Sequence, residues 1–443
     1  MDTKGGIFHS DFKPLPYWWE AWRPREEAPS DPPPATDVAI IGGGYGGLNT
    51  ALELARNGID STVFEANDFG FGASTRSGGA VSAGINLGKG LGGRKWGGDE
   101  AARAALVNAL LGDGSQSFNL LADIIEREKI ECFYERSGRF IGAYTAKHYQ
   151  GLADKLALFN EQSDAHATMV PRERQREEID SGFYHGGMLV ERSAKLHPSL
   201  YYGGLLAACR RHKIQLVSRC CVSRIEGRRD AFTLTTQRGT VRSKHVVVAT
   251  NGYTGDATPQ LKRRIIPVAS HIIATEELPA DLARSLIPRG RTINDTPRVL
   301  TYYRMSPDGK RMVFGGRARF TAVGPEVSAP ALHRMMTDRF PQLAGAKVTH
   351  AWTGNVAFTF DYLPHMGEVD GMHYALGCNG SGVAMMSYLG HQTARKIIGG
   401  GNRVSAFEDL DFPARPFYTG NPWFLPIVGG WYRLRDRIDR AVG

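Results

Sequence analysis

Apolar runs and glycine turns alternate along this chain in an order that predicts strands and helices. The run Val38-Ala-Ile-Ile41 has the pattern of a buried strand, and the turn Gly42-Gly-Gly-Tyr-Gly-Gly47 follows it directly. A helical pattern then leads to a second apolar run, Ser61-Thr-Val-Phe-Glu65. Strand, tight turn, helix and strand in this register predict a βαβ unit.

The rest of the chain divides into helical and strand-like blocks. Helices are predicted at 98–128, from residue 144 to about 165, and at 196–211 and 383–398. Strands are predicted at 132–144, 215–217, 222–225, 244–250, 268–275, 298–304, 312–315 and 372–377. The apolar segment 244–250 is expected to return the chain to the sheet of the βαβ unit. The predicted fold class is α/β: a Rossmann-like nucleotide-binding domain and a discontinuous, mostly antiparallel β substrate domain that carries helices.

The length of 443 residues exceeds what one hydrophobic core usually supports, so at least two domains are expected. A proline-rich polar stretch, 23–36, separates an aromatic N-terminal arm from the first strand. The predicted divisions are an arm and linker at 1–35, a nucleotide-binding domain at 36–97, 186–264 and 350–410, a substrate-binding domain at 98–185 and 265–349, and a tail at 411–443.

The first glycine turn carries the chemistry of a dinucleotide site. Gly42 permits the sharp turn, Gly44 lets the backbone approach a pyrophosphate, and Gly47 lets the helix pack on the sheet. The helix N-terminus offers N–H groups and a positive dipole to phosphates. Glu65 follows at the distance expected of an acid that binds ribose hydroxyls, and its charge disfavours a 2′-phosphate.

Charge and composition exclude several other classes of protein. The net charge of +9 comes from scattered basic residues interleaved with acids, which indicates a solvated surface rather than a nucleic-acid site. The first 22 residues lack an apolar core, so neither a secretory signal nor a transmembrane segment is expected, and a cytoplasmic location is predicted. The five cysteines have no metal-type spacing, and no metal is expected.

Four segments, taken together, carry a resemblance to a known family. They are the glycine turn, the loop Gly72-Ala-Ser-Thr-Arg-Ser-Gly-Gly79, the strand Val246-Val-Val-Ala-Thr-Asn-Gly252 and the turn Gly377-Cys-Asn-Gly-Ser-Gly-Val383. In this order the chain resembles the D-amino acid oxidase family of FAD-dependent amine oxidoreductases, and its layout is most similar to the γ-glutamylputrescine oxidase branch. The resemblance implies an FAD-binding domain and a small-molecule amine or amino acid substrate.

The resemblance also implies which residues bind FAD. The loop at 72–79 runs beneath the flavin in the family, and the turn before residue 383 lies at the pyrimidine end of the flavin ring, where its N–H groups stabilise negative charge. An Arg in a glycine loop is otherwise often only a surface charge. The expected cofactor-binding residues are Gly42, Gly44, Tyr45, Gly46, Gly47, Glu65, Ala66, Ser74, Thr75, Arg76, Ser77, Gly78, Gly79, Val222, Thr250, Asn251, Gly252, Gly354, Gly380, Ser381, Gly382 and Val383.

Enzymes of this family take a hydride from the carbon that bears the amine, and water hydrolyses the resulting imine. Arg317, Arg304 and Tyr302 lie in strands that face the flavin in the family, so we expect an Arg to pair with a substrate carboxylate and the Tyr to bound the pocket. His271 is a further candidate. Each Arg can instead cap the sheet in an ion pair, and a lone His in an apolar strand is usually a core residue.

Departures from the family pattern limit the predicted chemistry. Ser381 stands where members commonly have His, and Val313 and Ala384 stand where sarcosine oxidases have Lys. A sarcosine substrate is therefore disfavoured, as is efficient use of oxygen. The overall layout implies an amine or amino acid substrate, with a γ-glutamylated or N-alkylated amine as one candidate. No Cys or His occupies the family's attachment positions, so FAD is expected to bind noncovalently.

The electron acceptor and the tail leave alternatives open. The leading hypothesis is an oxidase that uses O2, and the alternatives are a dehydrogenase that passes electrons to a quinone or protein carrier, and a non-catalytic FAD-binding subunit. The apolar and then basic segment 422–438 is expected to pack on its own domain, with docking to a partner or a membrane surface as the alternative.

Overall fold

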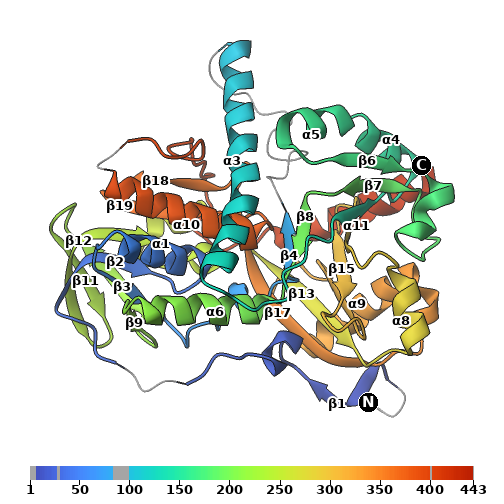
Figure 1. Cartoon of the computed structure of the whole chain (residues 1–443), viewed down its shortest axis with the longest axis horizontal. Helices are drawn as coiled ribbons and strands as arrows, with labels where there is room; N and C mark the ends of the chain where they lie inside the picture. The colour runs from blue at the N-terminus through green and yellow to red at the C-terminus, as the bar shows by residue number, and fades with distance from the viewer. Residues whose placement is uncertain (1–5, 27–29, 83–98, 400–401, 443) are drawn as a thin grey trace.

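The chain folds around two large sheets that lie side by side, with helices on their outer faces (Figure 1). The computed structural model describes residues 6–26, 30–82, 99–399 and 402–442. Within these residues one sheet has eight strands and another has nine, and β4 (Ala80–Ser82) pairs with β8 (Ser193–Lys195) in a small third sheet. The predicted α/β fold class is confirmed.

The eight-stranded sheet contains the predicted βαβ unit. Its strands are β2 (Ala35–Ile41), β3 (Ser61–Phe64), β9 (Gln215–Val217), β10 (Val222–Glu226), β11 (Phe232–Thr236), β12 (Gly239–Val248), β18 (His365–Val369) and β19 (Met372–Leu376). The central strands β19, β12, β2, β3 and β9 run parallel. β2 is fully buried from Val38 to Ile41, as expected for a strand that is covered on both faces.

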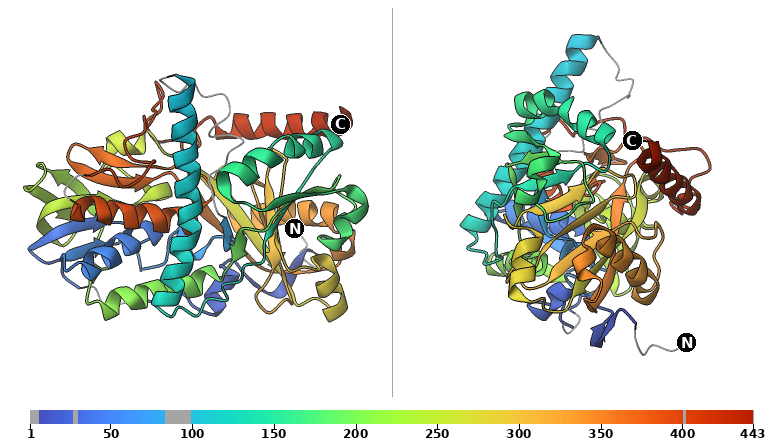
Figure 2. Two further views of the ribbon diagram at one scale, coloured as in Figure 1. Left: turned by 45° about the horizontal axis from the view of Figure 1, so that its top comes forward. Right: turned by 90° about the vertical axis from the view of Figure 1, so that its right-hand side faces the viewer.

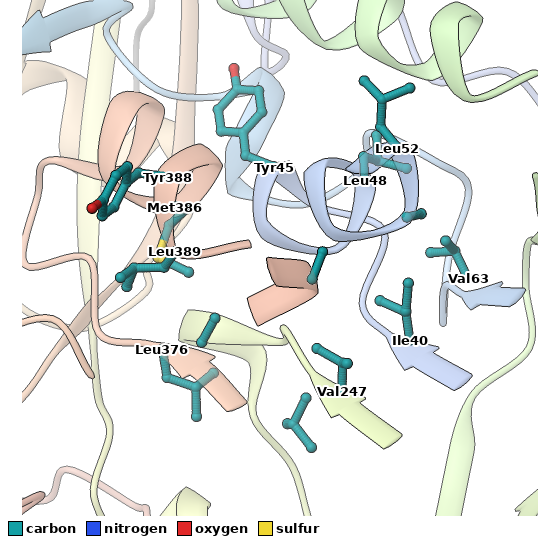
Figure 3. Close-up of a cluster of buried hydrophobic side chains, with 14 of the residues drawn as sticks. Ile40, Tyr45, Leu48, Leu52, Val63, Val247, Leu376, Met386, Tyr388 and Leu389 are labelled. Carbon is teal, nitrogen blue, oxygen red and sulfur yellow. The ribbon is translucent and has the colours of Figure 1, made fainter. Parts of the chain in front are cut away.

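Helices cover this sheet and form one continuous core with it. They are α1 (Tyr45–Arg56), α3 (Glu100–Arg127), α6 (Pro198–Arg211), α7 (Pro259–Lys262) and α10 (Gly382–Ile398). Figure 3 shows Leu48 and Leu52 of α1 above Val63 and Val247 of the sheet, with Leu389 of α10 to one side of them. The sequence predictions for α3, α6 and α10 are confirmed to within two residues.

The nine-stranded sheet forms the other half of the molecule. In sheet order its strands are β1 (Phe8–Lys13), β17 (Val348–Phe358), β13 (Ile266–Thr275), β16 (Met312–Gly316), β15 (Thr301–Met305), β14 (Thr292–Asp295), β5 (Arg139–Gly142), β7 (Gly187–Val190) and β6 (Ala167–Val170). Neighbours pair antiparallel except β1 with β17 and β14 with β5. This arrangement confirms the mostly antiparallel prediction.

Shorter helices surround the second sheet. They are α4 (Ala146–Ala153), α5 (Leu156–Ser163), α8 (Ala280–Leu286) and α9 (Pro325–Arg339), with 3₁₀ turns at Tyr17–Glu20, Ala73–Thr75, Arg172–Glu177, Asn251–Tyr253 and Pro341–Leu343. The single helix predicted up to residue 165 is two helices. Two predicted strands are shorter than expected: β5 starts only at Arg139, after a turn at Gly138 (φ +67°), and β15 starts at Thr301.

The two sheets also cross the predicted domain boundaries. β7 and most of β17 belong to the nine-stranded sheet, although 186–264 and 350–410 were assigned to the nucleotide-binding part. β1 of the N-terminal arm joins β17 at the edge of the same sheet. Strand pairing over long sequence distances decides these memberships, and local pattern does not contain that information.

The C-terminal tail forms a long helix, α11 (Leu425–Val442), on the outside of the substrate half (Figure 2). Asp436 accepts hydrogen bonds from the backbone N–H groups of Arg298 and Val299 at 3.0 and 2.9 Å. These bonds also explain why β15 begins late, because the two N–H groups are not free to pair with a strand. Among the described residues, no helix is long and apolar enough to cross a membrane.

Candidate active site

A cavity of about 1080 Å³ lies between the two sheets. One end is lined by the turns that follow β2, β3 and β12 and by the start of α10, and the other end by one face of the nine-stranded sheet and by α4 and α5. Open α/β sheets bind ligands beyond the carboxyl ends of their parallel strands, which is where the first end lies. The cavity therefore joins a nucleotide-type site to a chamber of different construction.

The β2–α1 turn brings backbone groups to the first end. Gly42 has φ +107°, a conformation that side chains other than glycine rarely adopt. A Cβ atom at Gly47 would lie 1.9 Å from the Gly42 carbonyl oxygen, so only glycine allows the helix this close to the turn. Gly47 itself does not line the cavity. The N-terminus of α1 points its positive dipole at the cavity, which suits a phosphate.

Glu65 lies at the end of β3 and is held by the backbone. Its two carboxylate oxygens accept hydrogen bonds from the N–H groups of Gly43 and Asn67, each at 3.0 Å. Burial raises the pKa of Glu65, while these two bonds act in the opposite direction. Ala66 and Val222 line the same part of the cavity. The carboxylate is thus fixed at the wall of the cavity, where it can accept further hydrogen bonds from hydroxyl groups.

The loop at 72–79 is pinned by hydrogen bonds from the aromatic arm and from β17. Trp18 donates its indole N–H to the Ser77 carbonyl at 2.8 Å, Trp19 donates to Thr75 Oγ1 at 3.0 Å, and Trp352 donates to the Arg76 carbonyl at 2.8 Å. Ser74 Oγ accepts the N–H of Tyr45 at 3.2 Å. Tryptophans distant in sequence therefore set the position of a loop that lines the cavity.

Two members of this loop play parts that differ from the expectation. Thr75 is fully buried, donates to the Gly70 carbonyl at 2.6 Å and does not line the cavity. Arg76 does line it, but its Nε and Nη1 donate to the carbonyls of Phe71 and Thr353 at 2.8 and 3.2 Å. Burial lowers the pKa of Arg76. Its guanidinium is thus mainly a brace between the loop and β17.

The start of α10 closes the other side of the first end. Asn251 Oδ1 accepts the N–H of Gly377 at 3.0 Å, which ties the turn after β12 to the turn after β19. The remaining expected residues of these two turns line the cavity, namely Thr250, Gly252, Gly380, Ser381, Gly382 and Val383, together with Gly354 of β17. The N-terminus of this 17-residue helix therefore adds a second positive dipole to the cavity.

Tyr302 stands on the sheet face where the two ends meet. Its hydroxyl lies 2.8 Å from Ser270 Oγ, and its ring covers Gly78 and Gly315, where added Cβ atoms would lie 3.0 and 2.4 Å from the ring. Burial raises the pKa of Tyr302 to about 12, so the phenol is neutral at physiological pH. A neutral phenol on a rigid strand can donate or accept a hydrogen bond without adding charge.

Arg317 follows β16 and lines the cavity on the same side as Tyr302. Its guanidinium lies over the Phe358 ring, 4.6 Å from the ring centre. Burial lowers the pKa of Arg317, although an arginine remains charged at neutral pH. Within the described part of the chain, no carboxylate lies within ion-pairing distance of this guanidinium. The arrangement leaves a cation available to an anionic group in the cavity.

Comparison with known proteins identifies the family. The family described as DAO, FAD dependent oxidoreductase, matches residues 37–396. This chain belongs to that family. It is 31% identical over 407 residues to gamma-glutamylputrescine oxidoreductase of Escherichia coli (strain K12), covering 91% of this chain and 93% of that protein.

Solved structures of low identity share the fold of this DAO-family protein. Glycine oxidase from Geobacillus kaustophilus superposes with a TM-score of 0.69 at 18% identity, covering 87% of this chain and 99% of that one. L-Proline dehydrogenase from P. horikoshii gives 0.68 at 17% identity, covering 84% and 96%. The chain is thus an FAD-dependent oxidoreductase of a family that acts on amines and amino acids.

The residues present fit FAD. The long cavity begins at two helix N-termini and a fixed carboxylate, and a Cβ added at Gly44 would lie 3.3 Å from Ser74 Oγ inside the turn. Helix dipoles and glycine backbone suit a pyrophosphate, and a buried acid suits ribose hydroxyls. The donor set on this chain therefore has the chemistry that the cofactor requires.

Arg304 and His271 do not reach the cavity, which corrects two predicted catalytic residues. Arg304 is 2% exposed and donates to the carbonyls of Leu196 at 2.8 Å and Met305 at 3.1 Å. His271 is fully buried, 2.7 Å from Thr353 Oγ1 and 3.3 Å from the Thr321 carbonyl. Side chains alternate across a strand, so His271 points away from the face that carries Ser270.

Sequence analysis missed several residues at the substrate end. Arg139 and Asn294 line the cavity from β5 and β14, and Lys147 and Lys155 line it from α4 and its loop. The one signal available in the sequence was alternation in the predicted strand 132–144, which places Arg139 and Ile141 on one face. Nothing local indicated that this face belongs to the cavity.

Proposed function

We propose that this protein oxidises the C–N bond of a γ-glutamylated or N-alkylated amine, with O2 as the electron acceptor. The observation that carries the proposal is the single cavity that joins a nucleotide-type site to an unpaired Arg317 and a neutral Tyr302. The likeness to gamma-glutamylputrescine oxidoreductase supports the substrate class.

In this proposal the backbone at the first end binds the cofactor without a covalent bond. The N-terminus of α1 and Gly44 would hold the pyrophosphate, Glu65 would accept hydrogen bonds from the ribose hydroxyls, and Val222 would contact the adenine. The N-terminus of α10 would stabilise negative charge on the flavin. When bound, FAD supplies the hydride-accepting chemistry at its N5 atom.

The substrate end orients the amine rather than deprotonating it. Tyr302 and Ser270 offer neutral hydroxyls, and Arg317 attracts a carboxylate next to the reacting amine, as in an N-alkylated amino acid, or the amide carbonyl oxygen of a γ-glutamylated amine. Asp295, which also lines this end, accepts hydrogen bonds from Thr301 Oγ1 and from Arg339 Nη2, each at 2.5 Å. Its charge is thereby neutralised, so it does not serve as a base in this proposal. The amine binds as the free base and places its α C–H toward the flavin.

A second candidate function is a dehydrogenase that passes electrons to a quinone or protein carrier. Val313, which stands where sarcosine oxidases place a Lys, is 2% exposed and packs with Trp18 and Trp352. An ammonium group that promotes the reaction with O2 is therefore missing from this position. The likeness to L-proline dehydrogenase shows only that a dehydrogenase has this fold.

The test is to mix the purified holoprotein anaerobically with amines, amino acids and γ-glutamyl amines, follow flavin absorbance, and then admit air. Bleaching by γ-glutamyl amines followed by rapid recovery in air supports the proposed oxidase. Bleaching with slow recovery in air favours the dehydrogenase. A flavin that none of these compounds bleaches would contradict both proposals.

A further inference from the structure

A second guanidinium without a partner lines the cavity, on β5. Arg139 forms no hydrogen bond or ion pair with any described residue, and its Nε is buried without an acceptor. Burial lowers the pKa of Arg139 to about 10, which still leaves it charged at neutral pH. A buried cation without an acceptor destabilises the free protein, and an anionic ligand would remove that penalty.

Three other arginines in the substrate half, unlike Arg139, donate to described acceptors, although Arg304 Nη2 is also buried without one. Arg339 pairs with Asp295 at 2.5 Å, Arg291 pairs with Glu178 at 2.6 Å, and Arg304 donates to backbone carbonyls. Each of these guanidinium groups braces the fold through at least one acceptor. Arg139 differs from them because it lines the cavity and donates to no described residue.

Asn294 on the neighbouring strand has a buried acceptor without a donor, whereas Arg139 has a buried donor without an acceptor. Its Oδ1 atom is buried and receives no hydrogen bond, and the residue lines the cavity. β14 pairs with β5 so that Thr292 lies opposite Arg139 and Asn294 lies opposite Ile141. Arg139 and Asn294 are thus on the same face of adjacent strands, one pleat repeat apart.

We propose that Arg139 and Asn294 form a subsite for an α-amino-acid head group at the end of the substrate distant from the reacting amine. The carboxylate of that head group pairs with Arg139, and its ammonium donates to Asn294 Oδ1. This inference rests on the proposed function, and it narrows the substrate class to amines that carry a distal zwitterion.

The spacing along the sheet fits such a substrate. Asn294 lies opposite Tyr302, so Arg139 is two strands and about two residues from Tyr302. Strand spacing and residue rise put their backbones about 12 Å apart. In a four-carbon diamine joined to the γ-carboxyl of glutamate, nine bonds separate the α-carbon from the terminal nitrogen, roughly 11 Å when extended. One molecule can therefore span both groups.

The first experiment measures binding without turnover. A γ-glutamyl n-butylamide, which has the head group but no terminal amine, is titrated into the holoprotein by calorimetry. The wild-type protein is expected to bind it, and Arg139→Met and Asn294→Leu are expected to weaken binding by about 10- to 100-fold. Arg136→Met, at an exposed position outside the cavity, is the matched control and should bind like the wild type.

Kinetics then separate this subsite from the proposed function. Arg139→Met should lower kcat/KM about 100-fold for a γ-glutamyl diamine and change it little for the bare diamine. Full FAD content in each variant shows that the fold is retained. Failure of the wild type to bind the butylamide, or equal losses for both substrates, would overturn the subsite. Butylamide binding without any flavin bleaching would retain the subsite and overturn the proposed function.

A different observation concerns the surface of α11. Five apolar side chains face outward along the helix and are 44–85% exposed. At about 100° per residue they fall within a stripe about 80° wide. They are Ile427, Trp431, Leu434, Ile438 and Val442.

The opposite face of α11 holds the helix in place. Asp436 caps the backbone of Arg298 and Val299, Asp439 pairs with Arg298, and Gly429 packs against Phe320. The two acids of α11 therefore face the protein. Because these contacts hold the inner face against the protein, the apolar stripe stays on the outside of the molecule, as Figure 2 shows for the helix.

Charge indicates what covers the stripe. Arg435 borders it on one side and Arg437 on the other, while the acids of the helix lie on the inner face. A stripe of apolar and Trp side chains with flanking arginines is the pattern of a helix that lies in a membrane interface. We infer that α11 binds an anionic bilayer surface, with the arginines against the lipid headgroups.

Vesicle sedimentation tests this second inference. The full-length holoprotein is expected to sediment with vesicles of phosphatidylcholine and phosphatidylserine, less with phosphatidylcholine alone, and less at high salt. Trp431→Glu with Ile438→Glu should abolish binding, while Val327→Glu, an equally exposed position on α9, should not. Absence of vesicle binding by the wild-type protein would overturn the inference. In that case, a wild-type dimer that the double variant converts to a monomer would show that a second copy of the chain covers the stripe instead.

Discussion

The two ends of the cavity are built from different parts of the chain. The nucleotide end is made of turns and helix starts, where glycine backbone and one carboxylate form the surface. The substrate end is made of side chains that rise from one face of a sheet, among them Arg139, Asn294, Tyr302 and Arg317. Backbone groups tolerate little change, whereas side chains on a fixed sheet can be exchanged. This contrast explains how one fold serves oxidoreductases of different substrates.

The largest expected effect comes from crowding the nucleotide end. Gly47→Ala places a methyl group 1.9 Å from the Gly42 carbonyl, so the turn must move and FAD should be lost. We expect a loss of about 3 kcal/mol in the free energy of unfolding. Urea unfolding and FAD content measure both effects. Gly112→Ala in α3, where a Cβ meets nothing within 4 Å, is the control; equal FAD content in the two variants would contradict the close-packing argument.

A change at the substrate end should leave the cofactor in place. Arg317→Met removes the unpaired cation, and we expect KM for a substrate whose carboxylate adjoins the reacting amine to rise about 10- to 100-fold, since hydrogen bonds to charged groups contribute about 1.5–3 kcal/mol. Steady-state kinetics with a measured FAD content test this. Arg319→Met, at an exposed neighbouring position, should behave like the wild type. A normal KM in Arg317→Met would reject the carboxylate role.

Acid should lower the free energy of unfolding through His197, at the start of a helix that covers the nucleotide-binding sheet. His197 caps α6, with its Nδ1 accepting the Leu200 N–H at 3.3 Å, and burial together with the nearby Arg304 lowers its pKa to about 4. In the unfolded chain the His197 imidazole binds a proton near its ordinary pKa of about 6.5. The contribution of neutral His197 to the free energy of unfolding is therefore complete above that pH and is lost as the pH falls toward about 4. Urea midpoints across this range should decline, and His197→Gln should flatten the decline while His166→Gln, an exposed position, should not.

The smallest effect is expected from one hydroxyl. Tyr302→Phe keeps the ring over Gly78 and Gly315 and removes only the contact with Ser270. We expect kcat/KM to fall about 3- to 10-fold, the value of one neutral hydrogen bond. Stopped-flow flavin reduction measures it. A loss as large as that of Arg317→Met would mean that the hydroxyl touches the reacting amine directly.

The local sequence pattern was sufficient to predict the nucleotide end of the cavity. The run Val38–Ile41, the glycines at 42–47 and Glu65 are adjacent in sequence, and a tight turn between a buried strand and a helix leaves the backbone few alternatives. The starts of α6 and α10 were also predictable, because Pro198 and the glycines before residue 383 mark helix boundaries. These features depend on interactions within a few residues.

Contacts between segments distant in sequence decided which side chains line the substrate end of the cavity. Arg317 and Arg304 look alike in sequence, yet Arg304 donates to the carbonyl of Leu196, while Arg317 lies over the Phe358 ring and lines the cavity. Arg139 gained its position because β5 pairs with β14, more than 150 residues later in the chain. The sequence by itself determined the fold class, the family and the nucleotide turn. Tertiary structure alone decided which charges were left without partners, because strand pairing assigns each side chain its neighbours.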